Sequence, residues 1–341
     1  MRIIKKFASI KQTPIYLKNL RLYPDLVRKD YDKHLNLSIK FLSKEIPIRL
    51  GTMIDTIDHL PYGFVNLSNV HKIRDWYCES FDDILNTDTN NNNQVFSDKL
   101  DNIIKRHDPV IMTMAKGIHE YKRQVYYTDQ IKHLIQDFLD DFYINRIGIR
   151  LLIKQHLKLF EDEKNIEGIV QENMPLKSVI TEAYNDAAFL CDRHYDIVPK
   201  LKFISEDINI SYIRDHLHYV FFELIKNSMG AIGRTYDENN DKNTDLVINL
   251  SQTDEIVSIK ISDTGKGIAL DDIDKIFQYA YSTGSSSLLE EDYDYRTSVP
   301  PMEGFGYGLQ MSKLYSEYFN GKIKLCSQDG YGTDVFIYLR K

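Results

Sequence analysis

A carboxylate and an amide stand four residues apart in the segment Phe222–Ser228, where Glu223 and Asn227 share one side of an expected helix. An amide oxygen can ligate Mg²⁺ without adding charge, and a neighbouring carboxylate can accept a proton or orient water. These residue types therefore suit a site that handles phosphate and metal. Taken alone, the pair is more commonly two polar residues on the surface of an amphipathic helix.

A second segment places an aspartate and two glycines directly after an expected strand. Asp263 follows the run Ile256–Ser262 and is itself followed by Gly265 and Gly267. The carboxylate can accept a hydrogen bond from an exocyclic amine such as that of adenine, and the glycines let backbone approach a ligand closely. An ordinary Asp–Gly turn is the simple alternative.

Glycines recur in two further segments near the end of the chain. The segment Gly304–Leu309 (GFGYGL) opens an expected helix, and the free N–H groups at a helix start favour phosphate. Its GxGxG spacing, with no strand immediately before it, argues against a dinucleotide-binding Rossmann motif. The segment Gly330–Asp334 (GYGTD) precedes the last expected strand. The simple alternatives are a flexible hinge for the first segment and a turn for the second.

These four segments lie in a half of the chain that mixes strands with helices. Expected strands cover 246–250, 256–262, 322–327 and 334–339, and expected helices cover 178–195, 216–232 and 308–319. The mixture indicates a sheet with helices on one face. The preceding part, from about 35 to 160, has a helical period and predicts an antiparallel bundle of long helices. We expect the domain boundary after residue 165, in a polar linker at 161–173.

Bulk composition excludes several classes of protein. The 341 residues are 43% hydrophobic and 27% charged, which is ordinary for a globular chain of about two domains. The net charge of -7 gives no electrostatic reason to expect a nucleic acid partner. Cys78, Cys191 and Cys326 are too far apart in sequence to suggest a zinc motif or a disulfide framework. No apolar run reaches the ~18 residues that a membrane span needs.

The N-terminus is basic. The first 24 residues contain no Asp or Glu, and their basic residues are Arg2, Lys5, Lys6, Lys11, Lys18 and Arg21. Mitochondrial targeting segments have this bias. A basic first helix that stays in the folded protein would have it too, and the sequence leaves both interpretations open.

The order of the four segments is more informative than any one of them. A helix with ELIKNS, a strand with DTGKG, a loop, GFGYGL opening a helix, and GYGTD before a last strand follow the order of the GHKL ATP-binding fold. Histidine kinases and type II topoisomerases share that fold. Over nearly its whole length, the chain further resembles the mitochondrial α-ketoacid dehydrogenase kinases. The resemblance rests on KEIPIRL (44–50), LPYG (60–63), RDWYCESF (74–81), RHDPVIMTMAKGIHEYK (106–122), FYINRIGIRLLIKQH (142–156), HLHYVFFELIKNSM (216–229), YAYSTG (279–284) and GFGYGLQMSKLYSEYF (304–319). In detail, these segments look more like those of the pyruvate dehydrogenase kinases than those of the branched-chain α-ketoacid dehydrogenase kinases. Among the former, they look most like the plant-type members.

The resemblance implies a role for each candidate site residue. Glu223 would be the general base that accepts the proton of a substrate serine, and Asn227 would ligate Mg²⁺. Asp263 would bind the amino group of adenine, supported by Thr333. The rest of the ATP site would comprise Glu223 and Gly230 on the helix, Gly265 and Gly267 in the purine pocket, Ser282 and Thr283 in a lid that runs to Pro301, and Gly304, Phe305, Gly306, Tyr307, Gly308 and Leu309 around the phosphates.

Two of the positions that depart from the family pattern bear directly on the roles of site residues. The family has Arg where this chain has Gly230, one turn after Asn227, which puts a phosphate or lid contact in doubt. Animal members have His four residues before the base, where this chain has Tyr219, so we assign no His–Glu dyad to His218.

His156 and the chain end carry two further expectations. His156 stands roughly where a sensor histidine kinase carries its phosphoacceptor, but Leu157 follows it instead of an acidic residue, which favours a structural role. The animal pyruvate dehydrogenase kinases of this family carry a long tail after the last strand, whereas Lys341 ends this sequence. We therefore expect docking to rest on the helical bundle alone.

The resemblance thus implies a protein-serine kinase of the mitochondrial matrix that uses ATP and Mg²⁺ to phosphorylate the E1α subunit of the pyruvate dehydrogenase complex. Residues 1–165 would form a four-helix-type bundle for dimer formation, docking of the E2 lipoyl domain and regulation. Residues 166–341 would form a histidine-kinase-like ATP-binding α/β sandwich, and the protein would be a homodimer. Two alternatives stay open: a branched-chain α-ketoacid dehydrogenase kinase, and a non-catalytic nucleotide-binding adaptor, which the glycine at position 230 suggests.

Overall fold

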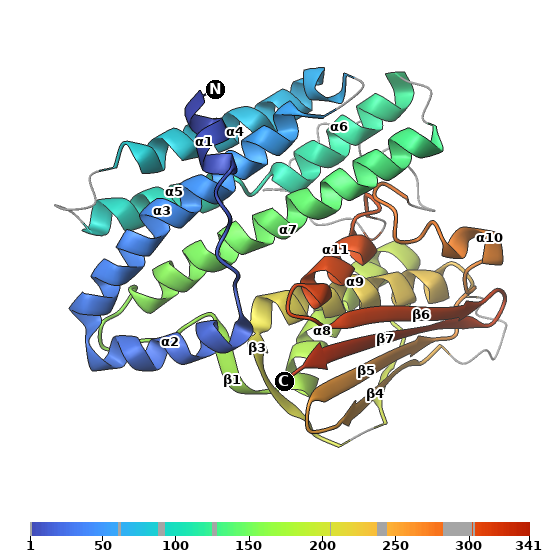
Figure 1. Cartoon of the computed structure of the whole chain (residues 1–341). Helices are drawn as coiled ribbons and strands as arrows, with labels where there is room; N and C mark the ends of the chain where they lie inside the picture. Colours follow the sequence, from blue (N-terminus) through green and yellow to red (C-terminus); the bar gives the residue numbers. More distant parts are fainter. Residues whose placement is uncertain are drawn as a thin grey trace. The chain divides into compact units, whose positions relative to one another are not determined.

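The computed structural model describes residues 2–60, 63–87, 93–124, 128–204, 206–236, 244–281, 302 and 304–341. The chain divides into two compact units, Met1–Ile169 and Val170–Lys341, each with its own secondary structure (Figure 1). The boundary therefore lies a few residues beyond the position that we expected from the sequence.

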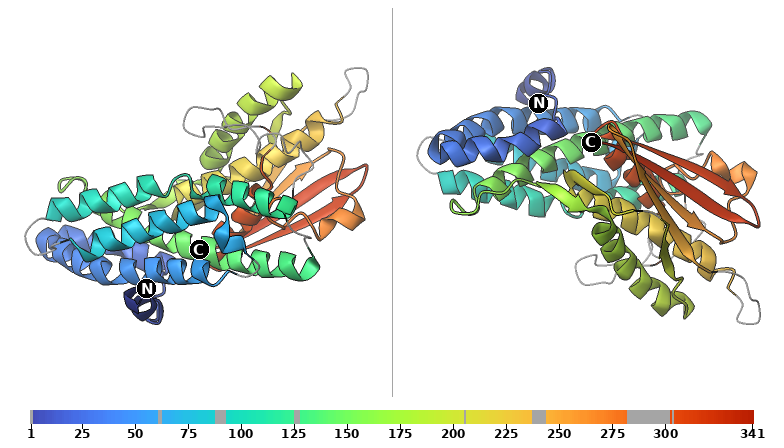
Figure 2. Two further views of the ribbon diagram at one scale, coloured as in Figure 1. Left: turned by 90° about the horizontal axis from the view of Figure 1, so that it is seen from above. Right: turned by 90° about the horizontal axis from the view of Figure 1, so that it is seen from below.

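In the described part of unit 1, all regular structure is helical. The helices are α1 (Arg2–Ala8), α2 (Leu17–Lys29), α3 (Tyr31–Asp58), α4 (Ser68–Leu85), α5 (Asn93–Arg106), α6 (Val110–Gln124) and α7 (Asp129–Leu159), with a 3-10 turn, η1 (Phe64–Asn66), between α3 and α4. Helix α3 packs against α4 and α7, and α4 packs against α6 (Figures 1 and 2). Apolar side chains at helical spacing form the buried centre, so the predicted bundle of long helices is confirmed.

The basic N-terminal segment is packed onto the bundle. Phe7 of α1 meets Phe81 of α4 edge-to-face, with ring centroids 5.4 Å apart. Further along, Thr13 donates its backbone N–H and its hydroxyl to the two oxygens of Glu45, at 2.9 and 2.8 Å. Glu45 also pairs with Arg49 at 2.9 Å, and Arg49 donates to the carbonyl of Thr13. The structure therefore agrees with a basic N-terminus that is part of the folded unit.

The end of unit 1 includes residues that we had assigned to the next domain. Ile166 packs in a small buried cluster with Leu159. Ile169 donates its backbone N–H to the side-chain oxygen of Gln155 at 2.9 Å, and the Gln155 amide donates to the carbonyl of Leu20 at 3.1 Å. The polar stretch that we read as a linker is thus folded into unit 1 in its first part and forms a strand of unit 2 in its last part.

Unit 2 combines a sheet with helices. Its elements are β1 (Val170–Pro175), α8 (Leu176–Tyr195), β2 (Leu201–Phe203), β3 (Asn209–Ile213), α9 (Arg214–Gly233), β4 (Leu246–Gln252), β5 (Ile256–Asp263), α10 (Leu270–Ile273), α11 (Gly308–Glu317), β6 (Lys322–Gln328) and β7 (Gly332–Arg340). Five strands form a sheet in the order β2-β4-β5-β7-β6, in which β2 and β4 are parallel and the other pairs antiparallel. Strands β1 and β3 pair separately.

One face of this sheet is covered by helices (Figures 1 and 2). Helix α9 packs on β5 and β7, and α11 packs on β6 and β7. The covered face is apolar and includes Ile259 and Ile337, while Lys260, Phe336 and Tyr338 occupy the opposite face and are partly exposed. This alternation confirms the predicted sheet with helices on one side.

Candidate nucleotide-binding site

Helix α9 carries a shielded ion pair made of Glu223 and Lys226. The ammonium nitrogen of Lys226 lies 3.2 Å from Oε1 and 3.1 Å from Oε2 of Glu223. The two side chains are only 14% and 5% exposed, and the Lys226 nitrogen also stands 5.1 Å from the centre of the Phe222 ring. Glu223 is therefore not a solvated surface residue. Lys226 is a candidate functional residue that the sequence analysis missed.

The glycine-rich segment lies against this ion pair. A Cβ atom on Gly308 would stand 2.0 Å from Oε2 of Glu223, so that any residue other than glycine would displace the carboxylate. A Cβ atom on Gly304 would stand 3.7 Å from the Lys226 nitrogen. The structure thus brings the predicted base together with both ends of the predicted phosphate segment. Residues Phe305 and Leu309 of this segment are partly exposed.

The middle glycine of this segment, Gly306, is required by the backbone. Its φ of 75° is unfavourable for other residues, and a Cβ there would stand 2.3 Å from the carbonyl oxygen of Tyr281. The Gly306 carbonyl accepts the N–H of Ala280 at 3.1 Å, and the rings of Tyr279 and Tyr307 lie 5.2 Å apart. Residues 279–281 are therefore tied to the glycine-rich segment.

Asp263 ends β5 in a buried position close to α9. Its Oδ1 atom accepts the N–H of Gly265 at 3.0 Å, and it also bonds to the Ser228 hydroxyl and the Thr333 backbone. Burial raises the pKa of Asp263 above its usual value, and these hydrogen bonds oppose the shift. Thr333 lies directly opposite Asp263 in the β5–β7 register. The sheet thus places the two residues expected at adenine side by side.

The glycines after Asp263 allow other elements to come close. A Cβ on Gly265 would stand 2.6 Å from Ala231 of α9, and one on Gly267 would stand 2.0 Å from the carbonyl oxygen of Gln328. Both positions are thus explained by packing, independently of any purine contact.

Asn227 is exposed on α9, next to Lys226. Its amide is open to a ligand, as a metal-binding residue requires. Among the described residues, no group of three or more His, Cys, Asp or Glu side chains could hold a metal ion. Phosphate oxygens and water commonly complete the coordination of Mg²⁺, so an ion at Asn227 would not require a cluster of protein ligands.

Gly230, where the resembling family has arginine, is buried in α9. The guanidinium of Arg234, one turn later, folds back so that Nη1 lies 3.4 Å from the place of a Gly230 Cβ. Met302, just before the glycine-rich segment, flanks the same place at 3.6 Å. A cation therefore stands near position 230 although residue 230 carries none. Arg234 lies four residues after Gly230 on the same helix, and this spacing could have indicated the contact from the sequence.

His218 has a partner other than the candidate base. Its Nε2 atom lies 3.0 Å from a carboxylate oxygen of Asp186 on α8, and its ring stacks on Phe222. Tyr219 contacts Tyr315 of α11, with ring centroids 5.2 Å apart. These contacts agree with our assigning no His–Glu dyad. The lid residues Ser282 and Thr283, and the loop to Pro301, lie outside the described residues.

His156 is a buried structural residue of unit 1. Its Nδ1 atom is 2.8 Å from the Ser38 hydroxyl, and its Nε2 atom is 3.2 Å from the Ser97 hydroxyl. Burial lowers its pKa to about 4, so the ring is neutral near pH 7. A phosphoacceptor must be reachable by a phosphoryl donor, whereas both nitrogens of His156 are engaged inside the bundle.

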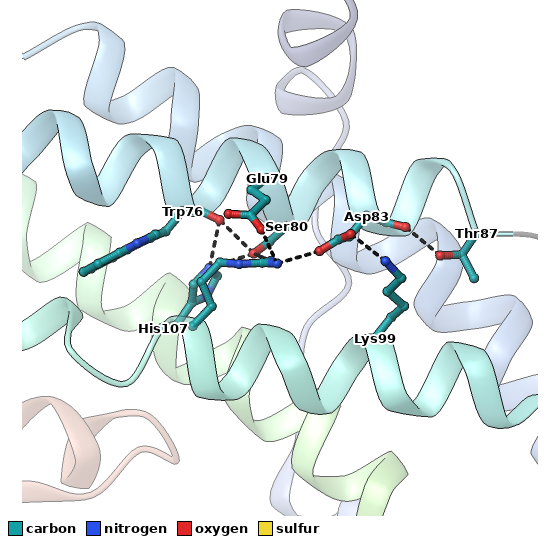
Figure 3. Close-up of polar contacts among 8 residues, drawn as sticks. Trp76, Glu79, Ser80, Asp83, Thr87, Lys99 and His107 are labelled. Carbon is teal, nitrogen blue, oxygen red and sulfur yellow. Dashed lines mark hydrogen bonds and ion pairs between the residues drawn. The ribbon is translucent and has the colours of Figure 1, made fainter. Parts of the chain in front are cut away.

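A second polar cluster joins α4 to α5 (Figure 3). The hydroxyl of Ser80 lies 3.0 Å from Nε2 of His107 and accepts a hydrogen bond from Arg106 at 2.8 Å. Arg106 continues to Asp83 at 2.8 Å, and Asp83 also pairs with Lys99. Burial and nearby arginines lower the pKa of His107 to about 3. The cluster brings together the family-like segment RDWYCESF, on α4, and the segment RHDP, which begins at the last residue of α5 and continues into the turn after it.

No described helix is long and apolar enough to cross a membrane.

Comparison with known proteins gives two family matches. Residues 14–181 match the family described as mitochondrial branched-chain alpha-ketoacid dehydrogenase kinase, and residues 212–341 match the histidine kinase-, DNA gyrase B-, and HSP90-like ATPase family. The second match confirms the predicted ATP-binding fold of this part of the chain.

Three similar proteins extend over nearly the whole chain. The pyruvate dehydrogenase (acetyl-transferring) kinase isozyme 4 of Homo sapiens is 37% identical over 355 residues, covering 99% of this chain and 84% of that protein. The human isozyme 3 is 37% identical over 354 residues, with coverage of 99% and 85%. The corresponding Arabidopsis thaliana kinase is 34% identical over 346 residues, with coverage of 99% and 93%. All three are named as mitochondrial.

Proposed function

Because the chain belongs to the family of mitochondrial pyruvate dehydrogenase (acetyl-transferring) kinases, we propose that it is a protein-serine kinase that uses Mg-ATP to phosphorylate and inactivate the pyruvate dehydrogenase complex. The substrate would be the E1α subunit. The observation that carries this proposal is the shielded carboxylate of Glu223 against the glycine-rich segment, where Gly308 leaves room for it. A proton acceptor beside a phosphate-binding segment is what transfer to a hydroxyl group requires.

The reaction follows from this arrangement. ATP would be held at adenine by Asp263 and at its phosphates by the glycine-rich segment. The serine hydroxyl gives its proton to Glu223 while its oxygen bonds to the γ-phosphorus. The bond from that phosphorus to the bridging oxygen breaks, and ADP leaves. Asn227 would hold Mg²⁺, which would supply charge neutralisation at the phosphates.

The pyruvate complex is favoured over the branched-chain complex by the whole-chain relatives. The family match over residues 14–181 is described as branched-chain, but it covers the helical part and only the beginning of unit 2. The similar kinases that cover 99% of the chain are named for pyruvate dehydrogenase. Purified protein and labelled ATP, offered with each complex in turn, test the choice. Label on the branched-chain component alone would contradict our proposal.

An adaptor without catalytic activity fits less well. Its motivation was the glycine at position 230, but the guanidinium of Arg234 reaches the space beside that position. Glu223 and Asp263 are both present and shielded. The same labelling assay decides, because an adaptor would bind ATP without transferring phosphate to either complex.

We further propose a homodimer that pairs through the sheet of unit 2. The uncovered face of the sheet carries Phe336 and Tyr338, each only partly exposed, and a Lys260–Asp334 ion pair at 2.8 Å. Apolar rings on a face that no helix of unit 2 covers, within the described residues, support such a use. Light scattering of the purified chain tests it, and a monomer mass would refute it.

Unit 1 would dock the lipoyl domain of the E2 acyltransferase. Its supporting observation is a set of large apolar side chains that remain exposed on neighbouring helices. They are Leu22 and Leu26 on α2, and Leu37 and Phe41 on α3. Binding of isolated lipoyl domain to the purified chain tests this, and loss of binding in a Phe41→Ser variant is expected.

The compartment would be the mitochondrial matrix, and a C-terminal fluorescent fusion located outside it would contradict that.

A further inference from the structure

The ammonium group of Lys226 faces two places at once. Two of its contacts go to the two oxygens of Glu223, at 3.2 and 3.1 Å. An ammonium group has three donors, and the glycine-rich segment lies beside it, with a Gly304 Cβ placed 3.7 Å from the nitrogen. The cation thus stands between the candidate base and the candidate phosphate segment.

We propose that Lys226 is a positioning residue shared between Glu223 and the terminal phosphate of ATP, so that the base is released to the substrate serine only when that phosphate takes the ammonium group. This inference rests on the proposed kinase function. It adds a coupling between the arrival of the phosphoryl donor and the availability of the proton acceptor.

The substrate hydroxyl and Lys226 compete for the carboxylate oxygens of Glu223. The serine hydroxyl must donate a hydrogen bond to Glu223 before its proton can be transferred. Oε1 of Glu223 already accepts a hydrogen bond from Lys226, and Oε2 lies 3.1 Å from the same ammonium nitrogen. The carboxylate is only 14% exposed, and Gly308 lies so close to Oε2 that a Cβ on it would stand 2.0 Å away. A hydroxyl therefore reaches the carboxylate most readily when the ammonium group moves away.

The ammonium group of Lys226 can leave Glu223 only for another negative charge. A lysine that is 5% exposed must keep an opposite charge near it, because an unpaired buried charge is strongly unfavourable. A terminal phosphate on the glycine-rich segment would supply such a charge on the side of Gly304. The Phe222 ring, 5.1 Å from the nitrogen, supports the cation from α9.

The proposed transfer balances in atoms and charge. With the ammonium group on the γ-phosphate, the serine proton passes to the freed Glu223 carboxylate as the serine oxygen bonds to phosphorus. The bond to the bridging oxygen breaks, and ADP carries that oxygen away. Lys226 neither gains nor loses a proton and stabilises charge on the transferred group, so it acts by position.

The test is a cycle of nucleotide affinities for Mg-ATP and Mg-ADP, measured by calorimetry on the full chain. The exchange predicts that Glu223→Gln tightens ATP binding by roughly three- to tenfold, since a neutral amide holds Lys226 less strongly than a carboxylate does and a phosphate can then take the ammonium group more readily. ADP affinity should change by less than about twofold, because ADP lacks the terminal phosphate. In Glu223→Gln/Lys226→Met the gain for ATP should vanish. Lys226→Arg should keep the preference for ATP over ADP, because it keeps the charge.

Lys177→Met is the matched control. Lys177 also pairs with a carboxylate, Asp207 at 2.7 Å, and also stands over a phenylalanine ring, Phe203 at 5.6 Å, in the same unit. Its removal should leave the affinity ratio of ATP to ADP at the wild-type value.

Two results would overturn the inference. One is an unchanged ratio of ATP to ADP affinity in Glu223→Gln, and the other is a gain for ATP that persists without Lys226. Either result with a wild-type chain that binds ATP and phosphorylates its substrate rejects the coupling alone. A wild-type chain that fails to bind ATP or to transfer phosphate rejects the proposed function and the inference together.

Discussion

Each unit of the molecule holds a glutamate paired with a cation one turn later on the same helix, and the two pairs differ in what surrounds them. In unit 1, Glu45 and Arg49 are 4% and 5% exposed, and Thr13 completes their hydrogen bonds. In unit 2, Glu223 and Lys226 are similarly shielded, but glycines adjoin them. The first pair is closed by the protein itself, whereas the second borders two glycines, Gly304 and Gly308.

This difference indicates how a structural ion pair can be distinguished from one that takes part in ligand binding. Desolvated charges are retained only when their hydrogen bonds are satisfied. Where another part of the chain satisfies them, as Thr13 does, the pair connects two elements and serves the fold. Where one side meets glycines instead, a charged ligand can take a share of the interaction. Four measurements test this contrast, from the largest expected effect to the smallest.

Glu223→Gln should slow phosphate transfer by roughly 10²–10⁴-fold, the usual contribution of a general base. The amide is nearly isosteric and keeps hydrogen-bond acceptance from Lys226, but it cannot take the proton. Turnover with saturating ATP measures the effect, and the melting temperature should stay close to that of the wild type. Normal turnover in this variant would show that Glu223 is not the base and would break the contrast.

Glu45→Ala should reduce the stability of unit 1 by about 3–5 kcal/mol, because it leaves Arg49 buried without its partner. Trp76 is the single tryptophan of the chain and lies in α4, so its fluorescence reports unfolding of unit 1 in urea. Glu161, which pairs with Lys158 at the surface, is the matched control, and its alanine variant should change stability by less than ~1 kcal/mol. Equal effects of the two variants would contradict the structural role.

Asn227→Ala should remove the Mg²⁺-dependent part of ATP binding, a loss of roughly tenfold or more, because the site has few other candidate metal ligands. Exposed Asn227 supports no buried contact of the kind seen at Glu45, so stability should change little. Titration with ATP in the presence and absence of Mg²⁺ measures the loss. An affinity within about twofold of the wild type in Mg²⁺ would exclude this metal role.

The stability of unit 1 should fall as the pH drops below about 6.5. His107 and His156 have folded-state pKa values lowered to about 3 and about 4, so the unfolded chain binds protons first. As the pH falls further, each histidine lowers the free energy of unfolding by up to about 1.4 kcal/mol per pH unit. This loss continues until the pH reaches the folded-state pKa of that histidine. Urea unfolding at pH 7 and pH 5 measures the slope. His156→Gln should make it shallower, and an unchanged slope would show that His156 is not neutral and enclosed.

Much of the fold could be predicted from local patterns. The expected helix at 216–232 is α9, Arg214–Gly233, and the expected strands at 256–262 and 334–339 are β5 and β7. Strands β1, β2 and β3 were missed because they are short, and because β1 pairs irregularly with β3 and lacks the alternation of a longer strand. The domain boundary was placed too early because a polar composition cannot reveal that Ile166 is buried.

Site residues could be predicted where the residue type within a motif is sufficient to indicate a role. They were harder to predict where the role depends on tertiary packing. Asp263 and Thr333 could be named from their motifs, while their direct pairing depends on the register of β5 and β7. Lys226 was overlooked because a lysine on an amphipathic helix is ordinarily solvated. Only the approach of Gly304 and Gly308, far along the sequence, shows that it is not.

The contacts that close unit 1 bear on how the protein is made. Gln155 joins Leu20, near the beginning of the chain, to Ile169, at the end of the unit. Because a ribosome releases the chain from its N-terminus onward, α2 emerges long before the partner that completes its packing. A nascent chain that ends before Gln155 must therefore leave that surface open, whereas one in which Ile169 is accessible can close the bundle before strands β4 to β7 of unit 2 are synthesised. Unit 1 is thus able to be a finished folding unit while the ATP-binding unit is still being translated.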